Sequence, residues 1–89
     1  MVWRIEFQRA AERELEKLGH EGARRILRFL NDRVARLDDP RSIGEALKGS
    51  ELGDFWKYRI DDYRVIASID DGAVQILIMR VGNRRDVYR

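Results

Sequence analysis

The fold is decided by residues 55–88, which read FWKYRIDDYRVIASIDDGAVQILIMRVGNRRDVY. Three runs rich in β-branched and aromatic residues are separated by two short acidic turns. This pattern predicts three antiparallel strands joined by hairpins. The first turn is Asp61-Asp62, and the second surrounds Asp71-Gly72, a dipeptide that favours tight hairpins. The last third of the chain therefore predicts an antiparallel meander.

The two faces of this meander differ in chemistry. If the first turn is a two-residue loop, Arg59 lies opposite Arg64, and side chains alternate faces along each strand. Lys57, Arg59 and Arg64 then share one face. The other face is apolar and carries Trp56, Tyr58, Ile60, Tyr63, Val65 and Ala67. Like charges on adjacent strands repel each other, so a fold seldom needs three cations so close together. A polyanionic ligand would need them.

The residues before the meander predict one strand and two helices. Residues 2–7 alternate polar and apolar side chains, as in a half-buried strand. A short helix follows, with Gly19 as its C-cap, and residues 20–22 form a tight connection. The second helix ends before Pro40, and residues 40–54 form a surface loop with one helical turn. The apolar stripe of the second helix consists of Ala23, Ile26, Leu27, Leu30, Val34 and Leu37.

The element order is therefore β-α-α-β-β-β, in a single α+β domain over residues 1–89. The helical hairpin needs an apolar surface to cover, and the meander offers one such face. We expect the helices on one face of a mostly antiparallel sheet, with the basic face left open.

Composition excludes several classes of site. The chain has no cysteine, so it has no disulfide, thiolate nucleophile or zinc–thiolate centre. Its acidic residues lack the spacing of metal ligands, and we expect no metal and no small-molecule cofactor. No apolar run approaches the ~20 residues that span a bilayer, and the N-terminus does not resemble a signal peptide. We expect a soluble, cytoplasmic protein with no membrane association.

Several motifs resemble those of the RelE/ParE superfamily of bacterial toxins. They are residues 17–19 (KLG), 47–49 (LKG), 56–59 (WKYR), 62–65 (DYRV) and 80–88 (RVGNRRDVY). The resemblance covers essentially the whole chain. It implies a toxin of a type II toxin–antitoxin system, neutralised by a cognate RelB-like antitoxin.

The superfamily divides by activity, and the resemblance favours one branch. RelE-like members cut mRNA in the ribosomal A site, whereas ParE-like members poison DNA gyrase and lack the nuclease residues. The basic and tyrosine positions of the RelE branch correspond here to Lys57, Arg59, Arg64, Arg84 and Tyr88. Lys48 and Arg85 are further candidates for phosphate binding. A gyrase poison, and a homologue that only binds its antitoxin, are the alternatives.

The reaction implied by the RelE branch uses no metal. The 2′-hydroxyl of the RNA attacks the adjacent phosphate, and the enzyme moves two protons and stabilises a phosphorane. Arginine does not deprotonate in proteins, and His20 lies on the helical side, which leaves Lys57 and Tyr88 as candidate bases. Arg64 and Arg84 are expected to hold the scissile phosphate, and Arg59 its neighbour.

Each of these residues also has a structural interpretation. Arg64 can pair with the acidic turn, Lys57 and Arg59 can be solvated strand cations, and Arg84 can be a charge near the chain end. Tyr88 and Arg85 can likewise be a core tyrosine and a tail charge.

An apolar strip accompanies the cations. Ile66, Leu77 and Met79 are expected on the same face as the arginines. The strip indicates either a sheet that is partly covered on both sides or a groove for the antitoxin.

Overall fold

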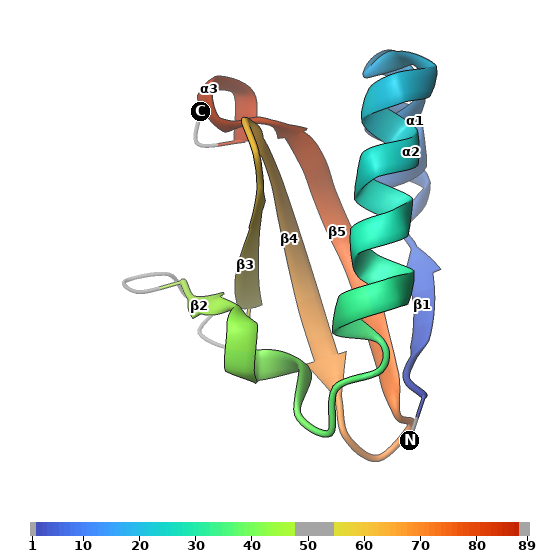
Figure 1. Cartoon of the computed structure of the whole chain (residues 1–89), viewed down its shortest axis with the longest axis vertical. Coiled ribbons are helices and arrows are strands. Elements are labelled where there is room, and N and C mark those ends of the chain that lie inside the picture. The colour runs from blue at the N-terminus through green and yellow to red at the C-terminus, as the bar shows by residue number, and fades with distance from the viewer. Residues whose placement is uncertain (1, 48–54, 88–89) are drawn as a thin grey trace.

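The computed structural model describes residues 2–47 and 55–87. Its helices and strands follow the predicted order, with additions around the long loop and at the C-terminal end (Figure 1). In chain order they are β1 (Arg4–Phe7), α1 (Arg9–Lys17), α2 (Gly19–Phe29), a π-helical turn (Leu30–Val34), a 3₁₀ turn (Pro40–Ile43), β2 (Glu45–Ala46), β3 (Phe55–Ile60), β4 (Tyr63–Asp70), β5 (Gln75–Asn83) and α3 (Arg84–Val87).

The strands form one five-stranded sheet in the order β1-β5-β4-β3-β2. β1 runs parallel to β5, and the other neighbouring pairs are antiparallel. α1 and α2 lie side by side against the same face of the sheet (Figure 1). The predicted α+β architecture, a helical hairpin on a mostly antiparallel sheet, is therefore confirmed. Neither helix, nor any other in the described residues, is long and apolar enough to cross a membrane.

The register of the first hairpin is as predicted. Arg59 lies opposite Arg64 and Ile60 opposite Tyr63, across the two-residue turn Asp61-Asp62. Because side chains alternate along both strands, this register divides apolar from basic residues. Tyr58, Ile60, Val65 and Ala67 all belong to the buried core under the helices.

The stripe of α2 is narrower than predicted. Ile26, Leu30 and Val34 are fully buried, whereas Leu27 is exposed. A helix that crosses a sheet touches it along a narrow line, and Leu27 is turned about 100° from Ile26 around the helix axis. Leu30 and Val34 continue the line in the π-helical turn, so the regular helix ends at Phe29 rather than near Leu37.

The predicted connection at residues 20–22 is wrong, because these residues lie inside α2. The chain turns between the helices at Leu18 and Gly19, and the φ of +82° at Gly19 is accessible to glycine. Gly22 serves packing instead of a turn. A Cβ atom there would lie 2.9 Å from the hydroxyl oxygen of Tyr63, so the missing side chain lets α2 approach β4.

The second hairpin turn lies where predicted but has a different form. Its loop covers residues 71–74, and the residue with positive φ is Val74 (50°). Arg41, from the 3₁₀ turn, holds this loop: its Nη2 and Nη1 atoms lie 2.6 and 3.1 Å from the Asp71 carboxylate oxygens. The same guanidinium lies 5.9 Å from the ring centroid of Trp56. A cation from a distant part of the chain thus binds this loop.

The Arg41–Asp71 pair makes stability depend on pH. The hydrogen bond from Arg41 lowers the pKa of Asp71 below its ordinary value of 3.8. A carboxyl group whose pKa is lowered by folding stabilises the folded state above its unfolded pKa, and this contribution disappears as pH falls through the folded pKa. Asp71→Asn should therefore lower the melting temperature at pH 7, and the difference from wild type should shrink below about pH 4. Thermal unfolding followed by circular dichroism between pH 2 and 7 measures this, with the exposed Asp38→Asn as control. A constant difference across that range would contradict the prediction.

Candidate functional site

The predicted basic residues of β3 and β4 lie on the sheet face opposite the helices. Lys57, Arg59 and Arg64 alternate with the buried Tyr58, Ile60 and Val65, so they point away from the core. The three cations differ in exposure. The side chain of Arg59 is 62% exposed, that of Lys57 is 18% exposed, and residue Arg64 is only 5% exposed. The face is therefore basic, but less open than predicted.

Arg64 holds the hairpin turn. Its Nη1 atom donates to the carbonyl oxygens of Asp61 (2.9 Å) and Tyr63 (2.8 Å). Asp61 has a positive φ of 53°, which is uncommon for a residue with a side chain. A charge-assisted hydrogen bond to its carbonyl stabilises that conformation. The structural alternative for Arg64 was an ion pair with the acidic turn. Arg64 does bind the turn, but through backbone carbonyls and not through the carboxylates of Asp61 and Asp62.

The acidic turn directs one carboxylate away from the basic face. The Oδ2 atom of Asp61 lies 2.7 Å from Nη1 of Arg25 on α2, which is on the helical side. Asp62 has another position: it lines a polar depression of about 580 Å³ together with Asn83, Arg84 and Arg85. Only one of the two acidic residues therefore lies beside the candidate phosphate-binding residues of α3.

The last helix places Arg84 beside the β3–β4 turn. α3 lies at the end of β5, beside the β3–β4 turn (Figure 1), and the backbone N–H of Arg84 donates to the Asp62 carbonyl at 3.0 Å. Arg64 lies opposite Gly82, two residues before Arg84. Both Arg84 and Arg85 are exposed. The predicted Lys48 and Tyr88 lie outside the described residues.

Glu45 belongs to the same face and was not predicted. β2 pairs with β3 so that Glu45 lies opposite Lys57. The Oε2 atom of Glu45 lies 3.3 Å from Nζ of Lys57, and its Oε1 atom lies 3.8 Å from Nη1 of Arg59. The carboxylate therefore bridges the two cations of β3, with its own side chain 56% exposed.

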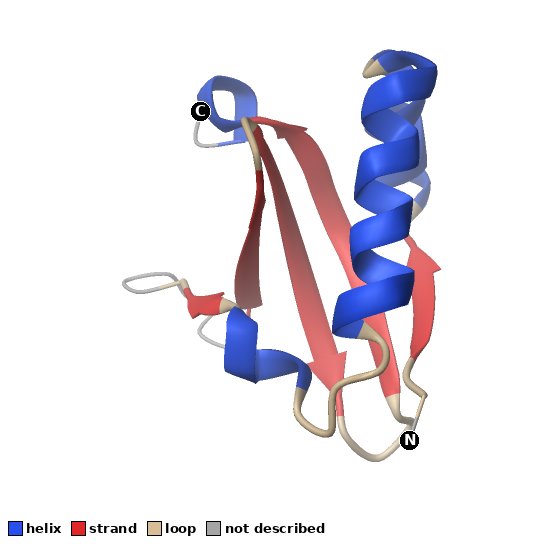
Figure 2. Cartoon of the chain, in the orientation of Figure 1, coloured by secondary structure: helices blue, strands red, loops and turns tan. Residues whose placement is uncertain are grey.

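The segment that carries Glu45 is anchored by a buried tyrosine. Tyr58 donates its hydroxyl hydrogen to the carbonyl oxygen of Pro40 at 2.6 Å. Burial, opposed by the charge of Arg41, raises the pKa of Tyr58 to about 12, so the hydroxyl keeps its proton. Gly44 packs on the tyrosine ring, where a Cβ atom would lie 3.1 Å from Cε1. Figure 2 shows the resulting arrangement, a short helical turn leading directly into β2 at the sheet edge.

The predicted apolar strip is only partly accessible. Ile66 is 9% exposed although it lies outside the main core cluster, while Leu77 and Met79 are partly buried. A register shift after Ile66 pairs it with Arg80 and pairs Ala67 with Ile78. Met79 is the extra residue of this bulge, so the strip does not continue in strict alternation. The sheet is thus partly covered on both sides, one of the two interpretations of the strip.

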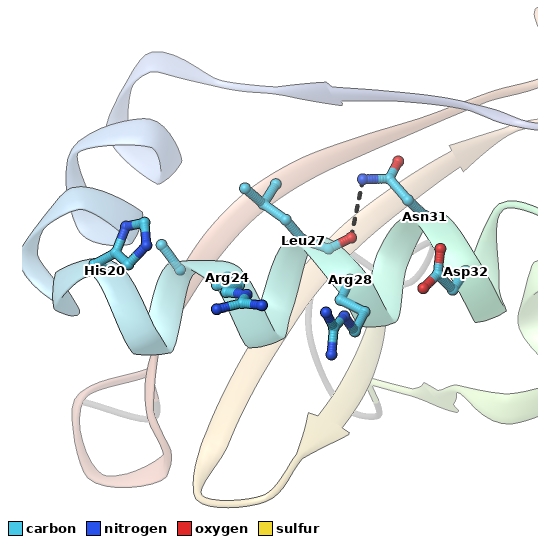
Figure 3. A pocket seen from close by; sticks show the side chains of 7 residues that line it. His20, Arg24, Leu27, Arg28, Asn31 and Asp32 are labelled. Carbon is cyan, nitrogen blue, oxygen red and sulfur yellow. Dashed lines mark hydrogen bonds between the residues drawn. The ribbon is translucent and has the colours of Figure 1, made fainter.

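His20 lies apart from the basic face. It lines a shallow depression of about 430 Å³ along the outer side of α2 and the turn that continues it (Figure 3). Two of its lining residues are joined by a hydrogen bond, since the Nδ2 atom of Asn31 donates to the Leu27 carbonyl at 2.9 Å. Among the described residues, no three histidine, aspartate or glutamate side chains are grouped to bind a metal ion.

The anchoring role of Tyr58 predicts a loss of stability on removal of its hydroxyl. In Tyr58→Phe the buried carbonyl of Pro40 loses its donor, which typically costs about 1–3 kcal/mol. We expect the free energy of unfolding, measured by urea titration, to fall by that amount. Tyr63→Phe removes a hydroxyl on the same side of the sheet and is the matched control. Equal losses in the two variants would argue against the anchor.

Comparisons with known proteins agree over nearly the entire chain. A family model described as "ParE toxin of type II toxin-antitoxin system, parDE" matches residues 5–88. Toxin RelG of Mycobacterium tuberculosis is 30% identical over 89 residues, covering 100% of this chain and 99% of that protein. A chain of the Mycobacterium tuberculosis toxin–antitoxin complex RelBE2 superposes with a TM-score of 0.85 at 28% identity, covering 97% of this chain and 95% of that chain. A chain of the RelE–RelB complex from Pyrococcus horikoshii superposes with a TM-score of 0.73 at 28% identity, covering 97% of this chain and 99% of that chain.

Proposed function

Because the chain belongs to the RelE/ParE superfamily of type II toxins, we propose that it is a ribosome-dependent mRNA endoribonuclease. It cuts mRNA in the ribosomal A site, in the cytoplasm, and so inhibits translation. Its partner is a cognate RelB-like antitoxin, a proposal supported by the toxin–antitoxin complexes among the similar structures.

The observation that carries the proposal is the placement of cations from neighbouring strands on one sheet face. Arg59 on β3 lies opposite Arg64 on β4, which in turn lies opposite Gly82 on β5. Neighbouring strands are roughly 4.8 Å apart, so this path crosses about 10 Å of sheet. The polar depression that Arg84 and Arg85 line lies beside the turn that joins β3 and β4, where the Arg84 N–H donates to the Asp62 carbonyl. A single RNA strand is a polyanion that such a path can hold by its phosphates.

The cleavage we propose is metal-independent attack by the RNA 2′-hydroxyl. Arg84 holds the scissile phosphate, since a guanidinium matches two phosphate oxygens at once. Arg85 and Arg59 hold neighbouring phosphates. Lys57 contacts the reacting centre, and Tyr88 orients the 2′-hydroxyl. Lys48 binds a further phosphate.

Arg64 has a double role in this proposal. Its guanidinium is committed to the Asp61 and Tyr63 carbonyls, so it fixes the turn between the two basic strands. Its positive charge still lies directly beneath the path, in a position screened from solvent. Buried charges act over longer range than solvated ones. Arg64 therefore stabilises the extra negative charge of the phosphorane electrostatically while positioning its neighbours.

The second candidate function is inhibition of DNA gyrase. The family model that matches residues 5–88 is that of ParE toxins, which favours this alternative. A gyrase inhibitor is a binding protein, and it needs no group that moves protons. Cleavage of RNA therefore separates the two functions directly.

A cell-free translation reaction supplied with purified protein tests the proposal. We expect new mRNA 5′ ends within codons at the ribosomal A site. The double variant Arg84→Ala, Tyr88→Phe should abolish them, and Lys57→Ala should slow cleavage by about 10²-fold or more. Arg24→Ala, on the outer side of α2, is the matched control for loss of one positive charge.

Two results would contradict the nuclease. Intact mRNA with normal translation would leave the gyrase function as the better explanation, and a DNA supercoiling assay would then be decisive. Cleavage that persists in the double variant would show that the activity comes from elsewhere.

A further inference from the structure

Strand β5 continues beyond the strand that pairs with its outer edge. β1 pairs with residues 75–78 of β5, and the Gln8 N–H donates to the Ile78 carbonyl at 2.9 Å. Figure 1 shows β5 extending past the end of β1 toward α3. Among the described residues, the part of β5 that leads to α3 therefore has a neighbouring strand, β4, on one side only.

A side chain of α1 binds β5 where β1 no longer does. The Oε1 atom of Glu14 accepts the backbone N–H of Val81 at 3.0 Å, and its Oε2 atom lies 3.2 Å from Nη2 of Arg80. The Glu14 side chain is only 26% exposed, and Val81 belongs to the buried core. A hydrogen bond from a backbone N–H to a carboxylate is charge-assisted, and it is stronger than one between neutral groups. Glu14 therefore fixes β5 at Val81.

This contact lies close to the candidate site along the chain. Gly82 follows Val81 directly and lies opposite Arg64. Roughly 10 Å of extended chain separates Val81 from Arg84. The Arg84 N–H donates to the Asp62 carbonyl, and the two residues line the same polar depression. A shift of β5 at Val81 would therefore carry Arg84 with it.

The bulge at Met79 gives this contact its importance. An extra residue in one strand disrupts the ladder locally and bends the strand. The direction of β5 beyond the bulge therefore depends on the bonds that follow it, and the Glu14–Val81 hydrogen bond is among the first of these. The ion pair with Arg80 is partly exposed, and such pairs contribute little to stability. The backbone hydrogen bond is thus the main contact.

We propose that Glu14 is a positioning residue of the candidate site, which sets the place of Arg84 by fixing β5 at Val81. Its effect on cleavage rests on the proposed nuclease function, whereas its effect on the position of Arg84 does not. Glu14 acts through β5 and needs no contact with RNA. A displacement of about 1 Å in a group that holds the substrate can slow a reaction 10²-fold.

Amide hydrogen exchange, measured by NMR on the full-length protein without RNA, tests the position of Arg84. Glu14→Ala should speed exchange at Val81 and Arg84 by about tenfold or more, because a hydrogen bond to a buried backbone N–H is lost. Glu14→Gln keeps an oxygen that accepts this N–H, and it should keep most of the protection. Glu16→Ala removes an exposed carboxylate of the same helix and is the matched control. Unchanged exchange at Arg84 in Glu14→Ala would overturn the inference.

Single-turnover cleavage of mRNA on programmed ribosomes tests the effect on the reaction. Glu14→Ala should lower the rate constant by about 10–10²-fold, and Glu14→Gln should restore most of it. If Glu14→Gln is as slow as Glu14→Ala, the charge that pairs with Arg80 matters and the backbone bond does not, against the inference. Asp71→Asn removes an ion pair at the opposite end of β5 and controls for lost stability. Equal slowing in Asp71→Asn would reduce Glu14 to a general stabilising residue.

A double-mutant cycle determines whether Glu14 acts through Arg84. In an Arg84→Ala protein the guanidinium to be positioned is absent, so the further change Glu14→Ala should slow the residual cleavage by less than about twofold. Losses that multiply would show that Glu14 acts by another route, and would overturn the inference. A wild-type protein that cuts no mRNA would instead overturn the proposed function, while hydrogen exchange would still decide whether Glu14 positions Arg84.

Discussion

The structure depends on the burial of Tyr58 in the middle of β3. Its ring is fully enclosed, packs edge-on against Phe29 of α2 at a centroid distance of 6.4 Å, and touches Gly44. Its hydroxyl donates to the Pro40 carbonyl. One side chain thus joins the sheet, the helical layer and the segment before β2. Because side chains alternate along a strand, the same burial turns its neighbours Lys57 and Arg59 to the opposite face.

This alternation explains why much of the fold was predictable from sequence. The period of two in β3 and β4 defined the register across Asp61-Asp62 without any knowledge of long-range contacts. The errors came where a distant residue decides the local structure. Gly22 was assigned to a turn but makes room for Tyr63 within a helix, and the second hairpin loop is held by Arg41, 30 residues away from Asp71 in the chain.

The candidate site was predictable only in part, for the same reason. Positions on long strands, such as Lys57 and Arg59, follow from periodicity. A strand of two residues has no measurable period, so nothing local distinguished Glu45 from the other glutamates. Only its pairing with β3 brings it to Lys57. The burial of Arg64 could not be predicted from the sequence either, because its guanidinium binds two backbone carbonyls at the turn, those of Asp61 and Tyr63.

Placement of the site opposite the helices also separates function from stability. Glu45 and Arg59 have largely exposed side chains that contact each other rather than the core, so their substitution leaves the packing intact. Arg64 affects both function and stability, because it is buried and holds the turn between the basic strands. Loss of activity in an Arg64 variant would therefore report folding and chemistry together. Variants of Glu45 and Arg59, by contrast, change the charge of this face and not its packing, because more than half of each side chain is exposed.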